Sequence, residues 1–245
     1  KQSMFNFNKI VALQTARAGS KSIPKKNLLE IGGHPLFAHS IIAATGSNII
    51  QHVYCSTDDT VIMDLSKHYN FNVINRPPEL CLDNCSHLEA IRHGVNEIEK
   101  DLGKQDIVVL LLGNVTGIDS AALDEAIDML GDNDSVVSVS EMNMFNPFRA
   151  HKIIDGLLDT WIDQDLIRSD TKVNDKNSAG NIYYCNGNFW VMRRNVLFDN
   201  DNNLPFEWLG KKIVPYIQNV FQELDAPWQL DYVEQSINTF KGRIK

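Results

Sequence analysis

Residues 10–27 read IVALQTARAGSKSIPKKN, an apolar run followed at once by a loop of small residues and cations. The run Ile10 to Leu13 is typical of a buried strand. Residues 16–27, the phosphate loop, place four cations around one Gly-Ser turn in a chain whose net charge is -8. Backbone N–H groups at such a strand end bind anions, and the added cations favour a polyvalent one. We therefore expect a polyphosphate, most naturally a triphosphate, at this loop.

Neither common phosphate-binding motif is present in the phosphate loop. A P-loop requires G-x-x-x-x-G-K-[ST], whereas Gly19 is followed here by Ser20-Lys21. The dinucleotide fingerprint G-x-G-x-x-G is also absent near this strand. The alternative is a solvated basic loop, but Pro24 fixes φ near about −65°, a stiffness that such a loop does not need. The pattern favours phosphate binding through side-chain charge.

Composition sets bounds on the protein class. The chain has 245 residues, 43% hydrophobic and 22% charged, which is typical of one large α/β domain. No window has the roughly 18 consecutive apolar residues of a membrane span, and the acidic balance argues against nucleic acid. The four cysteines include a C-x-x-x-C pair without a second pair at zinc spacing. We expect free thiols and a cytoplasmic location.

Strands and helices alternate in the first half of the chain. Apolar runs predict strands at 10–14, 52–56, 71–75 and 106–112, and helical periodicity predicts helices at 35–46, 59–69, 84–100 and 119–130. This order predicts βαβ units and a mostly parallel sheet with helices on both faces. Further strands are expected at 135–140, 182–192 and 220–224. Because ligands bind beyond the carboxyl ends of such strands, Arg17 and Asn114 are expected at one edge.

The whole chain, 1–245, is predicted to be a single domain, but its segment 142–184 is less regular and rich in polar residues. Two interpretations remain open from the residues alone: a flexible surface excursion, or an extension that contacts a second subunit.

The phosphate loop, followed by Gly33-His34-Pro35-Leu36, resembles the signature of the acylneuraminate cytidylyltransferases, the family of the CMP-sialic acid and CMP-nonulosonic acid synthetases. The resemblance covers nearly the whole chain in the family's order. Its further motifs are Ser56-Thr57-Asp58-Asp59, Arg76-Pro77-Pro78-Glu79-Leu80 with Asp83, Asn186-Gly187, and Glu223-Leu224-Asp225-Ala226-Pro227.

This resemblance implies a three-layer, Rossmann-like nucleotidyltransferase fold, CTP as substrate, a small acidic acceptor, Mg²⁺ as cofactor, and a homodimer in which 142–184 reaches the second subunit. The catalytic residues that it implies at the triphosphate are Arg17, Lys21 and Lys26. The residues implied at the nucleotide are Ala16, Gly19, Ser20, Asn27, Arg76 and Ser86. Those implied at the acceptor are Asn114, Arg149, Tyr184 and Asn186, and those implied at the metal are Glu223 and Asp225.

Two acidic pairs allow a structural and a chemical interpretation. Glu223 and Asp225 lie two residues apart at an expected strand end, so both point to one side. Mg²⁺ needs only one or two carboxylates besides phosphate oxygens, but an exposed strand edge is the alternative, and the family has aspartate at position 223. Asp59, after an expected strand, is predicted to cap a helix, and the role of Asp58 is open.

The chain departs from the family where the acceptor pocket is expected. The family's Leu-Gln-Pro-Thr-Ser-Pro-Leu-Arg segment is replaced by residues 111–118, with Leu112 at the glutamine and Ile118 at the arginine, and Tyr184 replaces a second arginine. Loss of groups that bind hydroxyls changes which acceptor is accepted. The leading hypothesis is a CTP-dependent cytidylyltransferase acting on a sialic-type sugar acid. The alternatives are a phosphonate or phosphorylated acid as acceptor, a catalytically inactive nucleotide-binding relative, and, last, a dinucleotide-dependent oxidoreductase.

Overall fold

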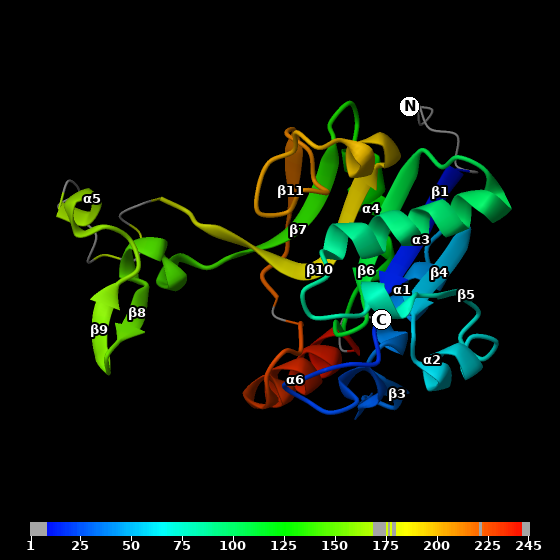
Figure 1. Cartoon of the computed structure of the whole chain (residues 1–245), viewed down its shortest axis with the longest axis horizontal. Coiled ribbons are helices and arrows are strands. Elements are labelled where there is room, and N and C mark those ends of the chain that lie inside the picture. The colour runs from blue at the N-terminus through cyan, green and yellow to red at the C-terminus, as the bar shows by residue number, and fades with distance from the viewer. Residues whose placement is uncertain (1–8, 169–174, 176, 178–179, 221, 242–245) are drawn as a thin grey trace. The chain divides into compact units, whose positions relative to one another are not determined.

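The computed structural model describes residues 9–168, 175, 177, 180–220 and 222–241, and its central element is a seven-stranded sheet (Figure 1). The strand order is β11-β7-β10-β6-β1-β4-β5. β1 pairs in parallel with β4 and β6, β4 pairs in parallel with β5, and β10 is antiparallel to β6. The strand bounds are β1 Ile10–Thr15, β4 His52–Thr57, β5 Asn72–Asn75, β6 Ile107–Leu112, β7 Ser135–Glu141, β10 Tyr183–Arg193 and β11 Ile213–Ile217.

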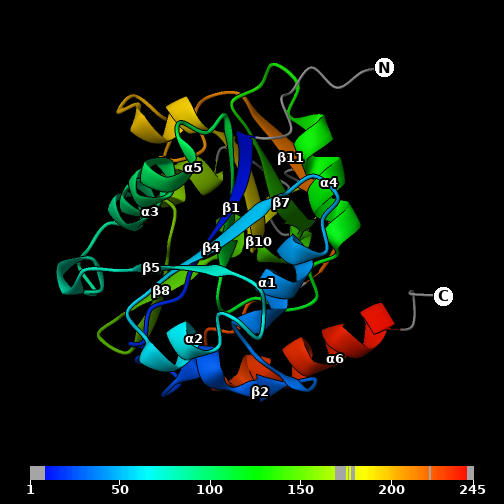
Figure 2. The ribbon, with the colours of Figure 1, turned by 90° about the vertical axis from the view of Figure 1, so that its right-hand side faces the viewer.

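Helices cover both faces of this sheet because its inner strands are apolar on both sides. Ile10 and Ala12 belong to the main core cluster together with residues of α1 and α4. Leu13 faces the other way and packs closely against α3, where Gly94 leaves room for its side chain. Figure 2 shows the sheet between α3 on one side and α1 with α4 on the other. The helix bounds are α1 Ala38–Thr45, α2 Thr60–Asp64, α3 His87–Leu102 and α4 Ser120–Met129.

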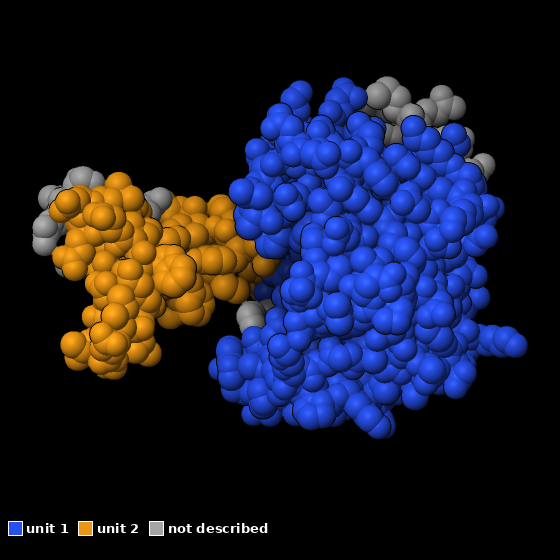
Figure 3. Space-filling view, viewed as in Figure 1, with its two compact units in different colours: residues 1–138, 186–216, 220–245 blue, residues 139–185, 217–219 orange. Residues whose placement is uncertain are grey.

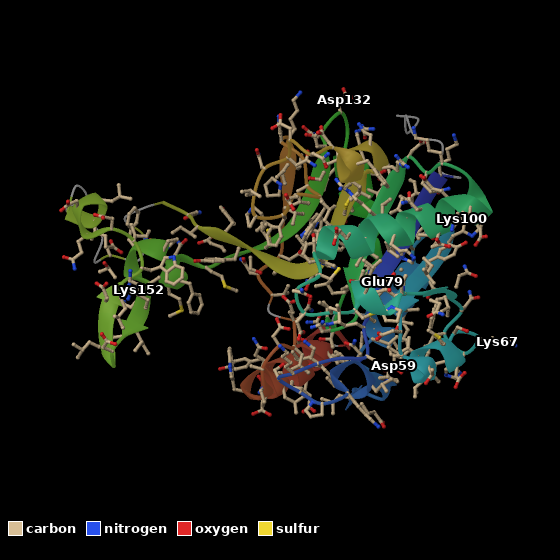
Figure 4. All side chains as sticks on the ribbon, viewed as in Figure 1. Asp59, Lys67, Glu79, Lys100, Asp132 and Lys152 are labelled. Carbon is tan, nitrogen blue, oxygen red and sulfur yellow. The ribbon has the colours of Figure 1, made fainter. Side chains whose placement is uncertain are left out.

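The predicted α/β fold with helices on both faces of a mostly parallel sheet is confirmed, with two local differences. Asp59 caps α2 as predicted, since its Oδ1 accepts from the Val61 amide at 2.9 Å (Figure 4), but the helix ends at Asp64 rather than near residue 69. The strand expected at 220–224 is wrong: Phe221 lies outside the described residues, and the others form only an isolated bridge at Glu223. The edge of the sheet beside β7 is formed instead by β11, which contains Pro215.

A second, smaller core holds the chain that follows β11. α6, Leu230–Lys241, contributes Val233 and Ile237 to this cluster. Leu224 is fully buried in it, together with Ile31 at the end of the short strand β2, Glu30–Ile31. β2 pairs with β3, His34–Pro35, directly after the phosphate loop. Because Leu224 points into this core, its neighbours at 223 and 225 point to the opposite side.

The chain divides into two compact units, coloured separately in Figure 3. Unit 1 holds residues 1–138, 186–216 and 220–245, and unit 2 holds residues 139–185 and 217–219. Unit 2 therefore contains the whole segment 142–184 that was predicted to reach a second subunit. Within that segment, residues 169–174, 176 and 178–179 lie outside the described residues.

Unit 2 is built around a β-hairpin that was not predicted from the sequence. β8, His151–Ile154, pairs with β9, Leu157–Thr160, across a two-residue turn in which Asp155 and Gly156 both have positive φ. An ion pair between Lys152, labelled in Figure 4, and Asp159 crosses the strands at 3.6 Å. α5, Gln164–Arg168, follows. Ile153, Leu157 and Leu158 are each more than 70% exposed in this hairpin.

None of the helices in the described part of the chain is both long and apolar enough to cross a lipid bilayer.

Candidate active site

A cavity of about 330 Å³ opens at the carboxyl ends of β1 and β6, which run parallel with Thr15 beside Leu112. Arg17 and Asn114 both line it, as expected for residues that follow the carboxyl ends of parallel strands. The other lining residues come from the end of β1, the phosphate loop and the turn after β6: Thr15, Ala16, Gly19, Ser20, Lys21, Ser22, Lys26, Asn27 and Gly113.

Gly113 allows the turn after β6 to lie against the phosphate loop. Its amide donates to the Thr15 carbonyl at 3.1 Å. A Cβ at this position would lie 2.7 Å from Cβ of Ala16 and 3.4 Å from Oδ1 of Asn27. Any side chain larger than hydrogen would therefore push the phosphate loop away from the sheet.

Two cations of the phosphate loop, Arg17 and Lys21, share one carboxylate. The Asp83 carboxylate accepts from Nη2 of Arg17 at 2.8 Å and pairs with Nζ of Lys21 at 2.6 Å. Nη1 of Arg17 donates to the carbonyl of Cys81 at 2.9 Å. The backbone of the loop is held by Asp58, whose Oδ1 accepts from the Ala18 amide at 2.7 Å. The loop donors are thus already engaged by groups that follow β4 and β5.

Lys26 and Asn27 occupy the far end of the loop, in the 3-10 helix Lys26–Leu28. Lys25, just before it, adopts a left-handed conformation with φ 53°. Nδ2 of Asn27 donates to the Arg17 carbonyl at 2.9 Å and so closes the loop on itself. The Lys26 side chain is only 14% exposed and pairs with Oδ1 of Asp225 at 2.9 Å.

Glu223 and Asp225 lie beside the cavity, in contact with Asn114 of its lining, because the chain around them pairs with the turn after β6. The Leu224 amide donates to the Asn114 carbonyl at 2.8 Å, and Val115 and Glu223 form a bridge. Nδ2 of Asn114 lies 3.3 Å from Oε1 of Glu223 and 3.0 Å from Oδ1 of Asp225. As predicted from their spacing, both carboxylates lie on one side of the chain, where one amide contacts them both.

The charged form of the Glu223 carboxyl is less stable in this site than it is in water. Burial and, next, the charge of Asp225 raise the pKa of Glu223 to about 7. Gly187 lies against it with φ 77°, and a Cβ there would be 2.5 Å from Oε2 of Glu223. Glycine is therefore needed at position 187 both for its backbone conformation and for the space that the carboxyl occupies.

The carboxylates beside the cavity fit Mg²⁺ only if the phosphates of a bound substrate supply further oxygen ligands. In the described ranges, no group of three or more His, Cys, Asp or Glu side chains is arranged to hold a metal. The pair Glu223 and Asp225, with close like charges beside a cavity lined by cations, supplies two hard oxygen ligands. Since Mg²⁺ in proteins is commonly bound by one or two carboxylates plus substrate phosphates, the residues present fit such a site.

Arg76 and His87 lie behind the phosphate loop. Arg76 is 5% exposed, and its guanidinium donates to Oγ and to the carbonyl of Ser56 at 3.0 and 2.7 Å. A ring nitrogen of His87 lies 3.0 Å from Oγ1 of Thr15, which lines the cavity. Burial and the Arg76 charge lower the pKa of His87 to about 4, so its ring is neutral at physiological pH. Ser86 is exposed and is the N-cap residue of α3.

The residues expected at the acceptor are distributed over both units. Asn114 and Asn186 belong to unit 1, and the buried amide oxygen of Asn186 accepts from Oγ of Ser138 at 2.7 Å. Arg149 and Tyr184 belong to unit 2, where the Tyr184 hydroxyl donates to the Phe145 carbonyl at 2.5 Å.

Ile118, one of the apolar replacements noted in the acceptor segment, packs against the main core. It is not among the residues that line the cavity, which come from the end of β1, the phosphate loop and the turn after β6. The apolar side chain at this position therefore has a packing role in this fold.

Sequence reasoning assigned no role to Asp83 and left that of Asp58 open. Their contacts join segments 66 and 40 residues apart, so local patterns carry no sign of them. The weak signal that did exist was the position of Asp58 directly after a strand, at the edge where the phosphate loop was expected.

Three comparisons place the chain among known proteins. Residues 11–241 match the family model described as cytidylyltransferase. The chain is 28% identical over 150 residues to the pseudaminic acid cytidylyltransferase and UDP-2,4-diacetamido-2,4,6-trideoxy-beta-L-altropyranose hydrolase of Helicobacter pylori, covering 60% of this chain and 29% of that protein. It is 33% identical over 138 residues to N-acylneuraminate cytidylyltransferase A of Danio rerio, covering 56% of this chain and 31% of that protein. The matches thus span less than a third of the length of either relative.

Two solved structures share the fold. The CMP:2-keto-3-deoxy-manno-octonic acid synthetase complexed with CTP superposes with a TM-score of 0.66 at 17% identity, covering 94% of this chain and 99% of that one. A 4-diphosphocytidyl-2C-methyl-D-erythritol synthase superposes with a TM-score of 0.65 at 14% identity, covering 94% and 98%. These likenesses concern the fold alone, and they confirm the nucleotidyltransferase fold expected from the sequence.

Proposed function

The chain belongs to the cytidylyltransferase family, and we propose that it transfers CMP from CTP to an acidic acceptor of the nonulosonic or sialic type, with release of pyrophosphate. The observation that carries the proposal is the cavity at the ends of β1 and β6, which three cations line and whose lining residues Asn114 and Lys26 contact two carboxylates. Relatives named for pseudaminic acid and for N-acylneuraminate support the acceptor class.

The reaction needs positioning and charge more than covalent chemistry from the protein. The oxygen of an acceptor hydroxyl attacks the α-phosphorus and its proton passes to water, while the bond from the α-phosphorus to the bridging oxygen breaks and its electron pair leaves with pyrophosphate. Arg17, with its planar fork of donors, and Lys21, a point charge, hold the phosphates that leave. Lys26, at the opposite end of the loop, serves the α-phosphate. Ala16, Gly19, Ser20 and Asn27 shape the wall between them.

Mg²⁺ is the proposed cofactor, held by Asp225 and Glu223 together with phosphate oxygens. When bound, it offsets the negative charge that gathers on the phosphates during transfer. In this chain Asn114 orients both carboxylates, Lys26 pairs with Asp225, and Gly187 leaves the space in which the Glu223 carboxyl lies. The longer Glu223 replaces the aspartate of the resembled motif, so Asp225 is the principal ligand in the proposal.

Arg76 and Ser86 are proposed on the nucleotide side of the site. Arg76 is held rigidly by Ser56, at the end of β4, and lies close enough to His87 to affect its pKa. Because His87 in turn contacts Thr15, these side chains connect the wall of the cavity to α3. Rigid support of this kind suits the recognition of a flat base.

The acceptor side is proposed to involve Asn114 and Asn186 of one copy and Arg149 and Tyr184 from unit 2 of a second copy in a homodimer. The exposed hairpin of unit 2 supports the dimer, because Ile153, Leu157, Leu158 and Trp161 are 67 to 75% exposed. Ile153 is paired with Leu158 and Ile154 with Leu157, so both faces of the hairpin carry exposed apolar side chains, which favours an interaction surface.

A second acceptor class is favoured by the replacement of residues 111–118. A phosphonate or a phosphorylated acid would need fewer groups that bind hydroxyls than a sialic acid. The remaining alternative is a catalytically inactive relative that binds CTP.

One assay separates these possibilities. The protein is incubated with CTP, Mg²⁺ and single acceptors from a panel of nonulosonic acids, phosphonates and phosphorylated acids, and pyrophosphate is measured, with EDTA and UTP as control arms. Turnover with a nonulosonic acid that EDTA abolishes supports the proposal. Turnover only with another acid selects the second acceptor class. CTP binding by calorimetry without turnover on any acceptor selects the inactive relative, and absence of CTP binding refutes the use of CTP.

A further inference from the structure

Asp83 lies at the rim of the phosphate loop and bridges its two outer cations. Its Oδ1 is 2.8 Å from Nη2 of Arg17, and its Oδ2 is 2.6 Å from Nζ of Lys21. One carboxylate thus uses both of its oxygens on two cations that line the cavity. This is the arrangement that a phosphate group would adopt with the same side chains.

The side chains of Asp83 and of its two cationic partners are exposed to water, so a bound anion can replace Asp83 in these contacts. The side chains of Arg17, Lys21 and Asp83 are 35, 80 and 49% exposed, and ion pairs in contact with water are weak and easily replaced. Lys26 differs, because its own side chain is only 14% exposed, although its partner Asp225 is 57% exposed. The outer pair of contacts can therefore open while the inner one stays in place.

Arg17 stays positioned when Asp83 leaves. Its Nη1 donates to the Cys81 carbonyl, and its own carbonyl accepts from Asn27. Asp58 holds the loop backbone at Ala18. Only the contacts made by Asp83 itself must break for a ligand to reach both outer cations.

Given the use of CTP proposed above, on which this step rests, we propose that Asp83 is a resident anion that Arg17 and Lys21 exchange for the outer phosphates of the incoming triphosphate. A ligand must displace the carboxylate from both cations, so a polyphosphate competes well and a monophosphate, which reaches only Lys26, gains nothing. When pyrophosphate leaves, Asp83 returns to the same cations and disfavours rebinding. Asp83 is thus a specificity and release element, with no contact to the reacting atoms.

The test compares Asp83→Asn with a matched control, Asp201→Asn. Asp201 pairs with Lys211 at 2.5 Å in an exposed position of the same unit, away from the cavity lining. Both variants remove one negative charge; Asp83→Asn removes two exposed ion pairs and Asp201→Asn removes one. Dissociation constants for CTP, inorganic tripolyphosphate and CMP are measured by calorimetry for the full chain and both variants. Melting temperatures verify that each variant is folded.

The expected result is that Asp83→Asn binds CTP and tripolyphosphate about 3- to 10-fold more tightly than both the parent and Asp201→Asn, as the loss of two exposed ion pairs allows. CMP affinity changes less than about 2-fold, and the gain shrinks as salt is raised because exposed charges are screened. In a Lys21→Ala background the gain is reduced, which a double-mutant cycle measures.

Equal or weaker polyphosphate binding by Asp83→Asn, or an equal gain for CMP, would overturn the exchange, while CTP binding by the parent would still support the proposed substrate. Absence of CTP binding in the parent and both variants would instead refute the use of CTP, and the role of Asp83 with it.

Discussion

Replacing Glu223 with glutamine tests the acidic pair through stability, without knowledge of the acceptor. The native site holds the pKa of this carboxyl near 7, above its ordinary 4.5, chiefly through burial and then through the charge of Asp225. The folded chain therefore binds this proton more tightly than the unfolded chain does. The resulting stabilisation is fully present below about pH 4.5 and is lost as the pH rises through about 7.

The size of the effect follows from the same pKa. The difference between 4.5 and about 7 corresponds to at most about 3.5 kcal/mol, since each pKa unit equals about 1.4 kcal/mol. This pKa already includes the favourable contacts of Asn114 and Lys26 with the charged form, and between pH 5 and pH 8 we expect a change of about 1–3 kcal/mol. Glutamine has nearly the same shape as glutamate, but its side chain does not ionise. Glu223→Gln should thus gain stability relative to the parent between pH 5 and pH 8.

Urea denaturation at pH 5 and pH 8 measures this difference directly. Glu79→Gln, an exposed carboxylate in the 3-10 helix Pro78–Leu80, is the control, and its stability relative to the parent should not change with pH in this way. If the difference in unfolding free energy between Glu223→Gln and the parent were the same at both pH values, the pKa of Glu223 would not be raised in the folded chain.

Adding Mg²⁺ at pH 8 extends the test to the proposed metal. A divalent cation between Glu223 and Asp225 offsets their repulsion, so Mg²⁺ should raise the melting temperature of the parent more than that of Glu223→Gln or Asp225→Asn, and EDTA should reverse the rise. Equal responses of the parent and both variants would rule out these carboxylates as the ligands.

Three further predictions concern the loop, the turn and the hairpin. Lys26→Ala should lower kcat/KM for CTP by about 10²-fold or more while changing stability by about 1 kcal/mol; Lys25→Ala is the control, and equal activity of the two variants would contradict the placement of the phosphate site. Gly113→Ala should cost about 1–3 kcal/mol in urea denaturation and weaken CTP binding, because its Cβ would overlap the phosphate loop; unchanged CTP affinity would show that the turn does not position the loop. Replacing both Leu158 and Trp161 with lysine should yield a monomer in sedimentation experiments with CTP binding retained, whereas a parent that is itself monomeric would refute the dimer.

The sheet was predictable wherever a local pattern sufficed. The apolar runs at 10–14 and 106–112 became β1 and β6, because a strand buried on both faces needs continuous apolar residues. β11 escaped prediction because Pro215 interrupts its pattern, and proline is tolerated there since β11 is an edge strand. The hairpin at 151–160 was missed although its sequence carries a local signal, the pair Asp155-Gly156 between apolar residues, which is typical of a two-residue hairpin turn.

The site was predictable to the extent that it follows from strand order and spacing. The carboxyl ends of parallel neighbours share an edge, which placed Arg17 and Asn114 together, and a spacing of two residues placed Glu223 and Asp225 on one side of the chain. The groups that hold these residues were not predictable, because Asp83 reaches Arg17 from 66 positions away. The demand for glycine at 187 likewise depends on a carboxyl 36 positions later in the chain.

The charges of the site set a condition on the acceptor. A polyanionic nucleotide and an acidic acceptor must meet beside Glu223 and Asp225, so the phosphate-loop cations are needed in full for the triphosphate. If Asp83 gives up Arg17 and Lys21 to the phosphates and Lys26 serves the α-phosphate, no cation of the cavity lining remains for the carboxyl group of the acceptor. A positive charge from elsewhere must then hold the acceptor, which is the role proposed for Arg149 from a second copy. Arg149→Ala should accordingly raise the KM of the acceptor while the dissociation constant of CTP stays unchanged, and an effect on CTP binding of the same size would place Arg149 on the nucleotide instead.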